Sequence, residues 1–171
     1  MKILIDNGHG IQTKGKRSPD GQLLEYAYTR DLARRIVSIL KARGYDAELL
    51  VPEEDDIPLS ERVRRVNEIC LTYEPSSPSP TGDLMPNVIL ISIHVNAAGD
   101  GAQWMNAIGW PCDTYKGPTE SYQHADCLYP AILTENFFMD GLDLEFLQSK
   151  TGKQAIVDTH VEGIIEYLSD K

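Results

Sequence analysis

Short apolar runs alternate along the chain with longer segments in which apolar residues recur at helical spacing. The runs are typical of buried strands of a parallel sheet. They are Ile3–Ile5, Asp46–Val51, Asn87–Ile93 and Ala131–Thr134. The most apolar is Asn87–Ile93, which we therefore expect at the centre of the sheet. A further run, Ile108–Tyr115, contains Pro111, which confines it to an edge or irregular strand because proline donates no ladder hydrogen bond.

Three segments between these runs predict helices. The first covers roughly Leu24–Arg43 and stops before Gly44, a residue that favours helix ends. In the second, Ser60 is expected to cap a helix whose apolar positions recur every three or four residues. The third runs from about Gly152 to Leu168. Strands separated by helices predict an α/β fold, a mostly parallel open sheet with helices on both faces.

The length and the net charge of the chain limit its domain count and the kinds of partner it can bind. The 171 residues are expected to form a single domain over 1–171, in which Pro75–Pro86 is a surface loop. A formal net charge of −10 argues against a nucleic-acid partner, which would require a basic face. The apolar runs are too short for a membrane span.

The N-terminus and the cysteines bear on the compartment. No signal peptide is predicted, so we expect a protein that is cytoplasmic until released or the mature part of an exported one. The three cysteines show no CxxC spacing and predict neither a disulfide framework nor a cysteine metal site. The oligomeric state is left open.

Polar, chemically versatile side chains follow the predicted strands. His9 lies in the turn IDNGHG after the first strand, and His94 and Glu135 directly follow two others. Taken alone, the first turn is equally consistent with an incidental histidine. Parallel strands share one direction, however, so these residues gather at one edge of the sheet, the usual place for ligands in open α/β folds. Glu25, which begins the first long helix, is expected near the same edge.

Two histidines and two glutamates at one edge suit a catalytic zinc ion. Two imidazoles and one carboxylate are good zinc ligands and leave a fourth position open for water. A second carboxylate, not bound to the metal, is needed to accept and return a proton. Reasoning from the residues alone does not decide which glutamate has which role.

Five segments in order resemble the motifs of the zinc-dependent N-acetylmuramoyl-L-alanine amidases, peptidoglycan hydrolases with a single α/β catalytic domain. These segments are IDNGHG, the helix-opening Glu25, LSERVRRVNE, ISIHVNAA and PAILTENFFMD. The resemblance implies that His9, Glu25 and His94 bind Zn²⁺ and that Glu135 is catalytic. The implied substrate is peptidoglycan, and the implied reaction is hydrolysis of the amide between N-acetylmuramic acid and L-alanine.

One interval departs from this family. Between the second histidine motif and the catalytic glutamate the family carries a further helix and substrate-contacting loops, whereas this chain has only Val95–Thr134. Residues 116–130 are interpreted as shortened, with Ser121–Tyr129 resembling the opening of a helix. Substrate preference is therefore not predicted from this region.

The remaining candidates have ordinary structural interpretations beside functional ones. Asp6 and Asn96 flank the expected ligands and either orient imidazoles or make turn and strand-end hydrogen bonds. His124 and His160 are interpreted as surface or packing residues. Arg62 and Asn67 are given a structural role on their helix, and Ser92 has no partners that would make it a nucleophile. Four aromatic residues either line a groove or pack in the core: Trp104, Trp110, Phe137 and Phe138.

Two other functions fit the same residues. A zinc carboxypeptidase would share the ligand set but requires an arginine to hold a terminal carboxylate, and the sequence singles out none near the site. A non-catalytic wall-binding or zinc-storing domain would share the fold. Glu135 argues against that function, because binding alone does not need it.

Overall fold

The centre of the molecule is a four-stranded parallel sheet with strand order β2-β1-β5-β6. The computed structural model describes residues 1–73, 77–78, 84–85, 87–97 and 129–169. The strands of the sheet are β1 (Lys2–Asn7), β2 (Asp46–Leu49), β5 (Val88–Asn96) and β6 (Ala131–Phe138). Its strand directions confirm the predicted parallel sheet, and β5 lies inside it as expected.

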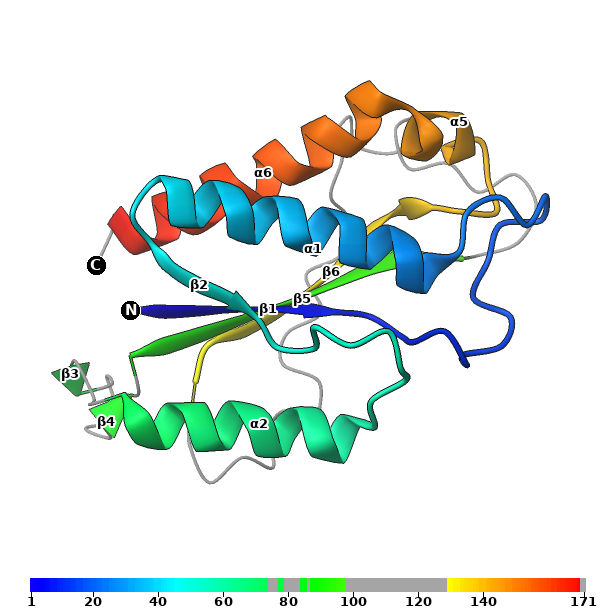
Figure 1. Ribbon diagram of the computed structural model, residues 1–171. Helices are drawn as coiled ribbons and strands as arrows, with labels where there is room; N and C mark the ends of the chain where they lie inside the picture. The colour runs from blue at the N-terminus through cyan, green and yellow to red at the C-terminus, as the bar shows by residue number, and fades with distance from the viewer. Residues whose placement is uncertain (74–76, 79–83, 86, 98–128, 170–171) are drawn as a thin grey trace.

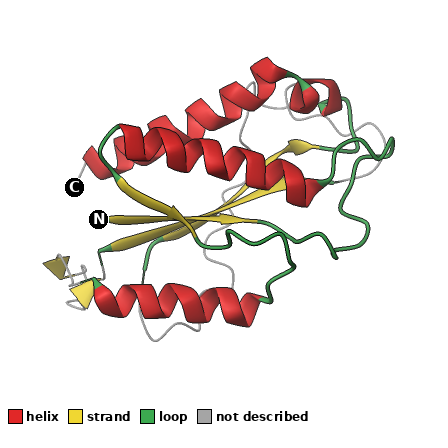
Figure 2. Ribbon diagram, in the orientation of Figure 1, coloured by secondary structure: helices red, strands yellow, loops and turns green. Residues whose placement is uncertain are grey.

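Helices cover both faces of this sheet (Figures 1 and 2). One face carries α1 (Glu25–Ala42) and α6 (Lys150–Ser169), which pack against each other. The other face carries α2 (Leu59–Thr72). A short helix, α5 (Leu144–Gln148), precedes α6, and β3 (Ser77–Pro78) pairs antiparallel with β4 (Leu84–Met85) apart from the main sheet. The predicted fold class is confirmed.

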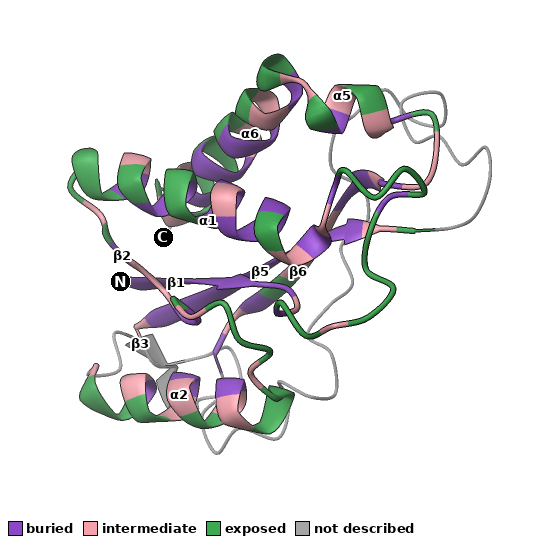
Figure 3. Cartoon of the chain, turned by 45° about the vertical axis from the view of Figure 1, so that its right-hand side comes forward, coloured by how far each residue is buried: buried purple, intermediate pink, exposed green. Residues whose placement is uncertain are grey.

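The alternation of side chains along β1 divides the core into two layers. Ile3 and Ile5 pack with α1 and α6, whereas Leu4 packs with the cluster beneath α2. All six residues of β1 are buried because both faces of the strand are covered, as Figure 3 shows. This double burial explains why the run is continuously apolar rather than alternating.

Most predicted boundaries hold within one or two residues, but the expected capping by Ser60 is wrong. The N-cap of α2 is Pro58, which has an extended backbone (φ −58°, ψ 149°) and whose carbonyl accepts hydrogen bonds from the Glu61 and Arg62 N–H groups. Ser60 therefore lies exposed inside the first turn. Helix α6 begins two residues earlier than expected. Helix α5 was not predicted, because five residues are too few to show a helical period.

The strands β5 and β6 extend further than their apolar runs. His94 and Glu135 were expected just after their strands, yet both lie within them, because the parallel ladder continues into the polar residues. The predicted strand Ile108–Tyr115, the helix opening at Ser121 and nearly all of the interval 116–130 lie outside the described residues. Among the described helices, none is both long and apolar enough to cross a membrane.

Candidate metal centre

The turn after β1 brings its histidine back over the end of the sheet. The Gly8 N–H donates a hydrogen bond to the Ile93 carbonyl at 3.0 Å, which ties the turn to β5. His9 follows with a φ of 61°, in the left-handed region that non-glycine residues seldom adopt. Such strain persists only where surrounding contacts enforce it.

Three side chains from separate elements meet at this point. The Glu25 Oε1 atom lies 3.3 Å from His9 Nε2 and 3.4 Å from His94 Nδ1. The two imidazoles are nearly perpendicular, with ring centroids 5.1 Å apart. One potential ligand atom from each residue lies within 4.8 Å of the others. The structure therefore brings together the three residues that the family resemblance implies as ligands.

The spacing of these atoms is compatible with a metal ion between them. The two contacts of Glu25 Oε1 with the imidazole nitrogens measure 3.3 and 3.4 Å. Atoms bonded to zinc at about 2.0–2.1 Å in a tetrahedron lie about 3.3 Å from one another. In addition, the buried Glu25 Oε2 atom has no hydrogen-bond partner among the described residues. The donor set and its geometry thus fit a zinc ion.

The environment of Glu25 keeps its carboxyl ionised. The side chain is buried at the start of α1, and its Oε1 accepts a hydrogen bond from the Val95 N–H at 3.1 Å. Burial by itself raises the pKa of this carboxyl, but His9, His94 and the Val95 N–H outweigh it and lower the pKa from 4.5 to about 2. A negatively charged ligand is therefore available throughout the neutral range.

Glu135 is placed beside this group by strand register. It lies directly opposite His94 in the β5–β6 ladder, and paired residues of neighbouring strands project from the same face. Both histidines line a hollow of about 520 Å³, together with Leu133 and the first residues of α2. The half-buried Glu135 thus belongs to the same end of the sheet as the three clustered side chains.

Comparison with known families decides the identity. A sequence profile described as N-acetylmuramoyl-L-alanine amidase matches residues 3–109, more than half of the chain. The chain belongs to this amidase family. The family resemblance stated from the motifs is thereby confirmed, and so is the enzyme class. A comparison with curated protein sequences finds no match.

Solved structures of similar proteins support the fold of the amidase. The N-acetylmuramyl-L-alanine amidase Ami1 from Mycobacterium smegmatis superposes with a TM-score of 0.72 at 17% identity, covering 100% of this chain and 98% of that one. The amidase AmiC2 of Nostoc punctiforme gives 0.69 at 22% identity, covering 99% and 97%. The catalytic domain of CwlV from Bacillus (Paenibacillus) polymyxa var. colistinus gives 0.70 at 20% identity and covers 100% of both chains.

Two buried arginines of the amidase hold the strained His9 turn. Arg30 of α1 donates to the His9 carbonyl at 2.9 Å, and Arg62 of α2 donates to the same oxygen at 3.3 Å. Arg62 also donates to the Asn7 carbonyl at 2.8 Å. No role was predicted for Arg30, and for Arg62 only a structural role on its own helix was predicted. A signal existed, since Arg30 falls at helical spacing with the buried Ala33 and Val37, where a charge needs a partner.

The flanking polar residues have identifiable contacts. Asp6 forms a buried ion pair with Arg62 and accepts a hydrogen bond from Ser92 at 2.7 Å. The Asn96 side chain accepts from the Ala97 N–H at 2.9 Å, which is a strand-end hydrogen bond. These contacts give Asp6 and Arg62 a structural role, as predicted for Arg62, and occupy Ser92 as a donor to a carboxylate.

Of the other candidates, those in the described residues lie mainly in the core. His160 is buried on α6, and Phe137 packs in the core with its ring centroid 5.0 Å from that of Phe146. Phe138 is half-buried. Three further candidates lie outside the described residues: Trp104, Trp110 and His124.

Gly8 provides a first test of this geometry. A Cβ at this position would lie 2.4 Å from Cε1 of the His94 ring, so Gly8→Ala is expected to push the imidazole away from Glu25 and to lower zinc affinity at least about tenfold. Zinc titration monitored by calorimetry measures the effect. Gly163→Ala on α6, where a Cβ meets no atom within 4 Å, is the control and should bind zinc as the parent does. Equal zinc affinity for Gly8→Ala and the parent would contradict the assigned ligand set.

Proposed function

We propose that this amidase uses a zinc ion held by His9, Glu25 and His94 to cleave the amide between N-acetylmuramic acid and L-alanine. The observation that supports the proposal is the approach of the three ligand atoms to within 4.8 Å of one another at the end of the sheet. Two imidazoles and a carboxylate leave room for water and substrate beside the metal. Membership of the family supplies the substrate class, peptidoglycan.

The protein residues divide the chemical work. Zinc, when bound, lowers the pKa of water and polarises the substrate carbonyl. Glu135, opposite His94 in the ladder, accepts the proton of the attacking water and later donates it to the leaving nitrogen of L-alanine. Glu25, whose carboxyl has its pKa lowered to about 2, remains an anionic ligand and does not compete for this proton.

A hollow beside the two histidines offers space for a substrate. The hollow of about 520 Å³ beside the histidines is bounded by the end of the sheet and by residues 56–59, which lead into α2. A muramyl peptide entering there would place its lactyl amide near His9 and His94, with Glu135 on the neighbouring strand. The turn after β1, strand β5 and the start of α1 thus supply the three ligands beside a hollow that α2 borders.

Digestion of purified peptidoglycan tests the proposed reaction. We expect the zinc-loaded protein to release new free amino termini of L-alanine, and expect a chelator to abolish this release until zinc is restored. The control is the same reaction without protein. Release of C-terminal amino acids instead would indicate a carboxypeptidase. Wall binding without any release would indicate a non-catalytic domain, and undiminished activity in chelator would overturn the role of the metal.

A further inference from the structure

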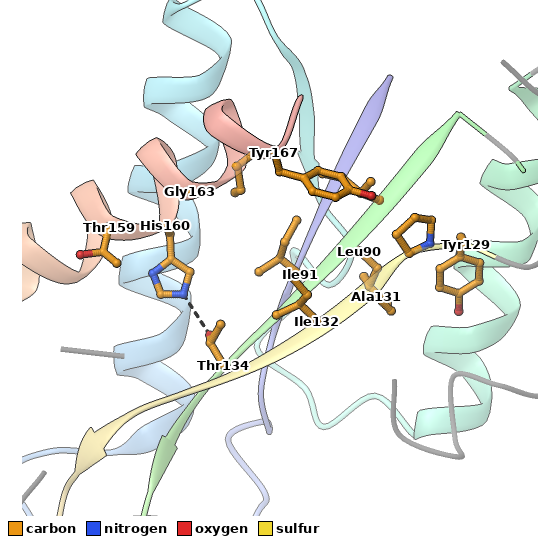
Figure 4. Close-up of a pocket in the computed structure, with 13 residues that line it drawn as sticks. Leu90, Ile91, Tyr129, Ala131, Ile132, Thr134, Thr159, His160, Gly163 and Tyr167 are labelled. Carbon is orange, nitrogen blue, oxygen red and sulfur yellow. Dashed lines mark hydrogen bonds between the residues drawn. The ribbon is translucent and has the colours of Figure 1, made fainter. Parts of the chain in front are cut away.

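A chain of buried polar groups lies on the α6 face of β6, opposite the metal centre. His160 of α6 is buried, and its Nε2 lies 2.9 Å from the Thr134 hydroxyl, as Figure 4 shows. Both residues line a cavity of about 420 Å³ whose other walls are mostly aliphatic and aromatic, among them Ile91, Ile132 and Ile164. Buried polar groups in such surroundings depend on one another for hydrogen bonds.

The direction of each hydrogen bond in this chain follows from its partners. His160 Nδ1 lies 2.8 Å from the Ile156 carbonyl, which only accepts, so Nδ1 carries the proton. Burial lowers the pKa of His160 and keeps the ring neutral, so Nε2 accepts from the Thr134 hydroxyl. The alternative acceptor for this hydroxyl, the Ser92 carbonyl, is more distant at 3.3 Å.

The chain continues to the backbone of the second histidine. The Asn136 side-chain amide nitrogen donates to the Thr134 hydroxyl at 3.3 Å and to the His94 carbonyl at 2.9 Å. The β5–β6 register is irregular between His94 and Asn96, so the ladder itself is interrupted here. The Asn136 side chain therefore ties β6 to His94 at the place where regular strand pairing stops.

Thr134 and Asn136 flank Glu135 on either side. Because side chains alternate along a strand, these two point toward α6 while Glu135 points to the opposite face, where His94 lies. Holding both neighbours fixes the backbone that carries the glutamate. The same set of hydrogen bonds holds the His94 carbonyl. The position of Glu135 relative to His94 is therefore set from the α6 side of the sheet.

We propose that His160, Thr134 and Asn136 form a positioning relay that sets Glu135 relative to His94 without touching substrate. The inference rests on the proposed catalytic role of Glu135. Through this relay α6, which does not line the hollow beside the histidines, contributes to the rate of the reaction. Side chains that orient catalytic or ligating groups in this way commonly affect activity by about 10- to 100-fold.

Substitutions at Thr134 test the relay. Thr134→Val keeps the shape and removes the hydroxyl, and we expect kcat on a soluble muramyl peptide to fall about 10- to 100-fold with KM and zinc content unchanged. Thr134→Ser retains the hydroxyl and should restore most of kcat. Thr159→Val is the matched control, because the Thr159 hydroxyl borders the same cavity but donates only to the Ala155 carbonyl of its own helix.

A second variant covers the case in which Thr134→Val fails to fold. In His160→Leu the Thr134 hydroxyl can turn to the Ser92 carbonyl, so no hydroxyl is left unpaired, and a several-fold fall in kcat is expected. Nitrogen-correlated NMR of the parent should show the neutral His160 ring with its proton on Nδ1, a readout independent of activity. A ring protonated on Nε2 alone would overturn the assigned directions.

The outcomes separate the relay from the proposed function. A kcat for Thr134→Val equal to that of Thr159→Val, or an equal loss in Thr134→Ser, would overturn the relay. Loss of zinc together with kcat in Thr134→Val would also overturn it. If Glu135→Gln abolishes hydrolysis while Thr134→Val stays fully active, the proposed function stands and only the relay fails. An active Glu135→Gln enzyme would instead remove the proposed function itself.

Discussion

Glu135→Gln is expected to lower hydrolysis by about 10²- to 10⁴-fold while zinc content stays at the parent level. The amide keeps the size of the side chain but cannot accept the proton of the attacking water, and general-base catalysis is worth about this factor. The register opposite His94 places this glutamate next to the cluster of His9, Glu25 and His94 without including it in that cluster. Rates on peptidoglycan and elemental analysis of the purified protein measure the two quantities.

Glu25→Gln is the informative partner of this substitution. If the two glutamates have the roles proposed, zinc content falls in Glu25→Gln and is preserved in Glu135→Gln. Glu145→Gln, an exposed substitution on α5, serves as the neutral control. Loss of zinc in Glu135→Gln with retention in Glu25→Gln would show that the roles are exchanged.

Arg62→Met is expected to reduce the free energy of unfolding by about 3–5 kcal/mol, the usual cost of removing one partner of a buried ion pair. Arg62 and Asp6 have side chains only 3% and 1% exposed, so the carboxylate would stay buried without its guanidinium. The substitution also removes donors to the Asn7 and His9 carbonyls, which hold the left-handed turn. Urea unfolding measures the first effect and zinc titration the second.

Comparison with an exposed arginine on the same helix isolates the effect of burial. Arg64 pairs with Glu61 and Glu68 in solvent, and Arg64→Met should change stability little. Combining Arg62→Met with Asp6→Leu removes both charges and should recover much of the loss. If Arg62→Met and Arg64→Met unfold at the same urea concentration, the buried pair does not stabilise the turn.

Elements with a repeated local pattern were predictable. The apolar run around Ile3–Ile5 and the helical spacing of apolar residues in α1 both correspond to the buried positions of these elements. Each pattern can be recognised within a short stretch of sequence. The start of α2 was not predictable from a capping residue, because both Pro58 and Ser60 are residue types found at helix starts. The backbone conformation in the structure identifies Pro58 as the N-cap. The five-residue helix α5 is too short to show apolar residues recurring at helical spacing.

The candidate site was likewise predictable only in part from the sequence. Strand direction alone placed His9, His94 and Glu135 at one edge, since all parallel strands end there. It did not decide which of the two glutamates lies against the histidines. The structure brings Glu25 to within 3.4 Å of both imidazoles, whereas Glu135 lies opposite His94 on the neighbouring strand β6.

The sequence by itself determined the alternation of strands and helices, the sheet edge that gathers the polar residues and the kinds of ligand available there. These properties follow from local periodicity and chain direction. Only the tertiary structure decided the register of Glu135 against His94, the meeting of Arg30 and Arg62 on one carbonyl, and the relay behind β6. These depend on contacts between segments that lie 21 to 53 residues apart, which no local pattern records.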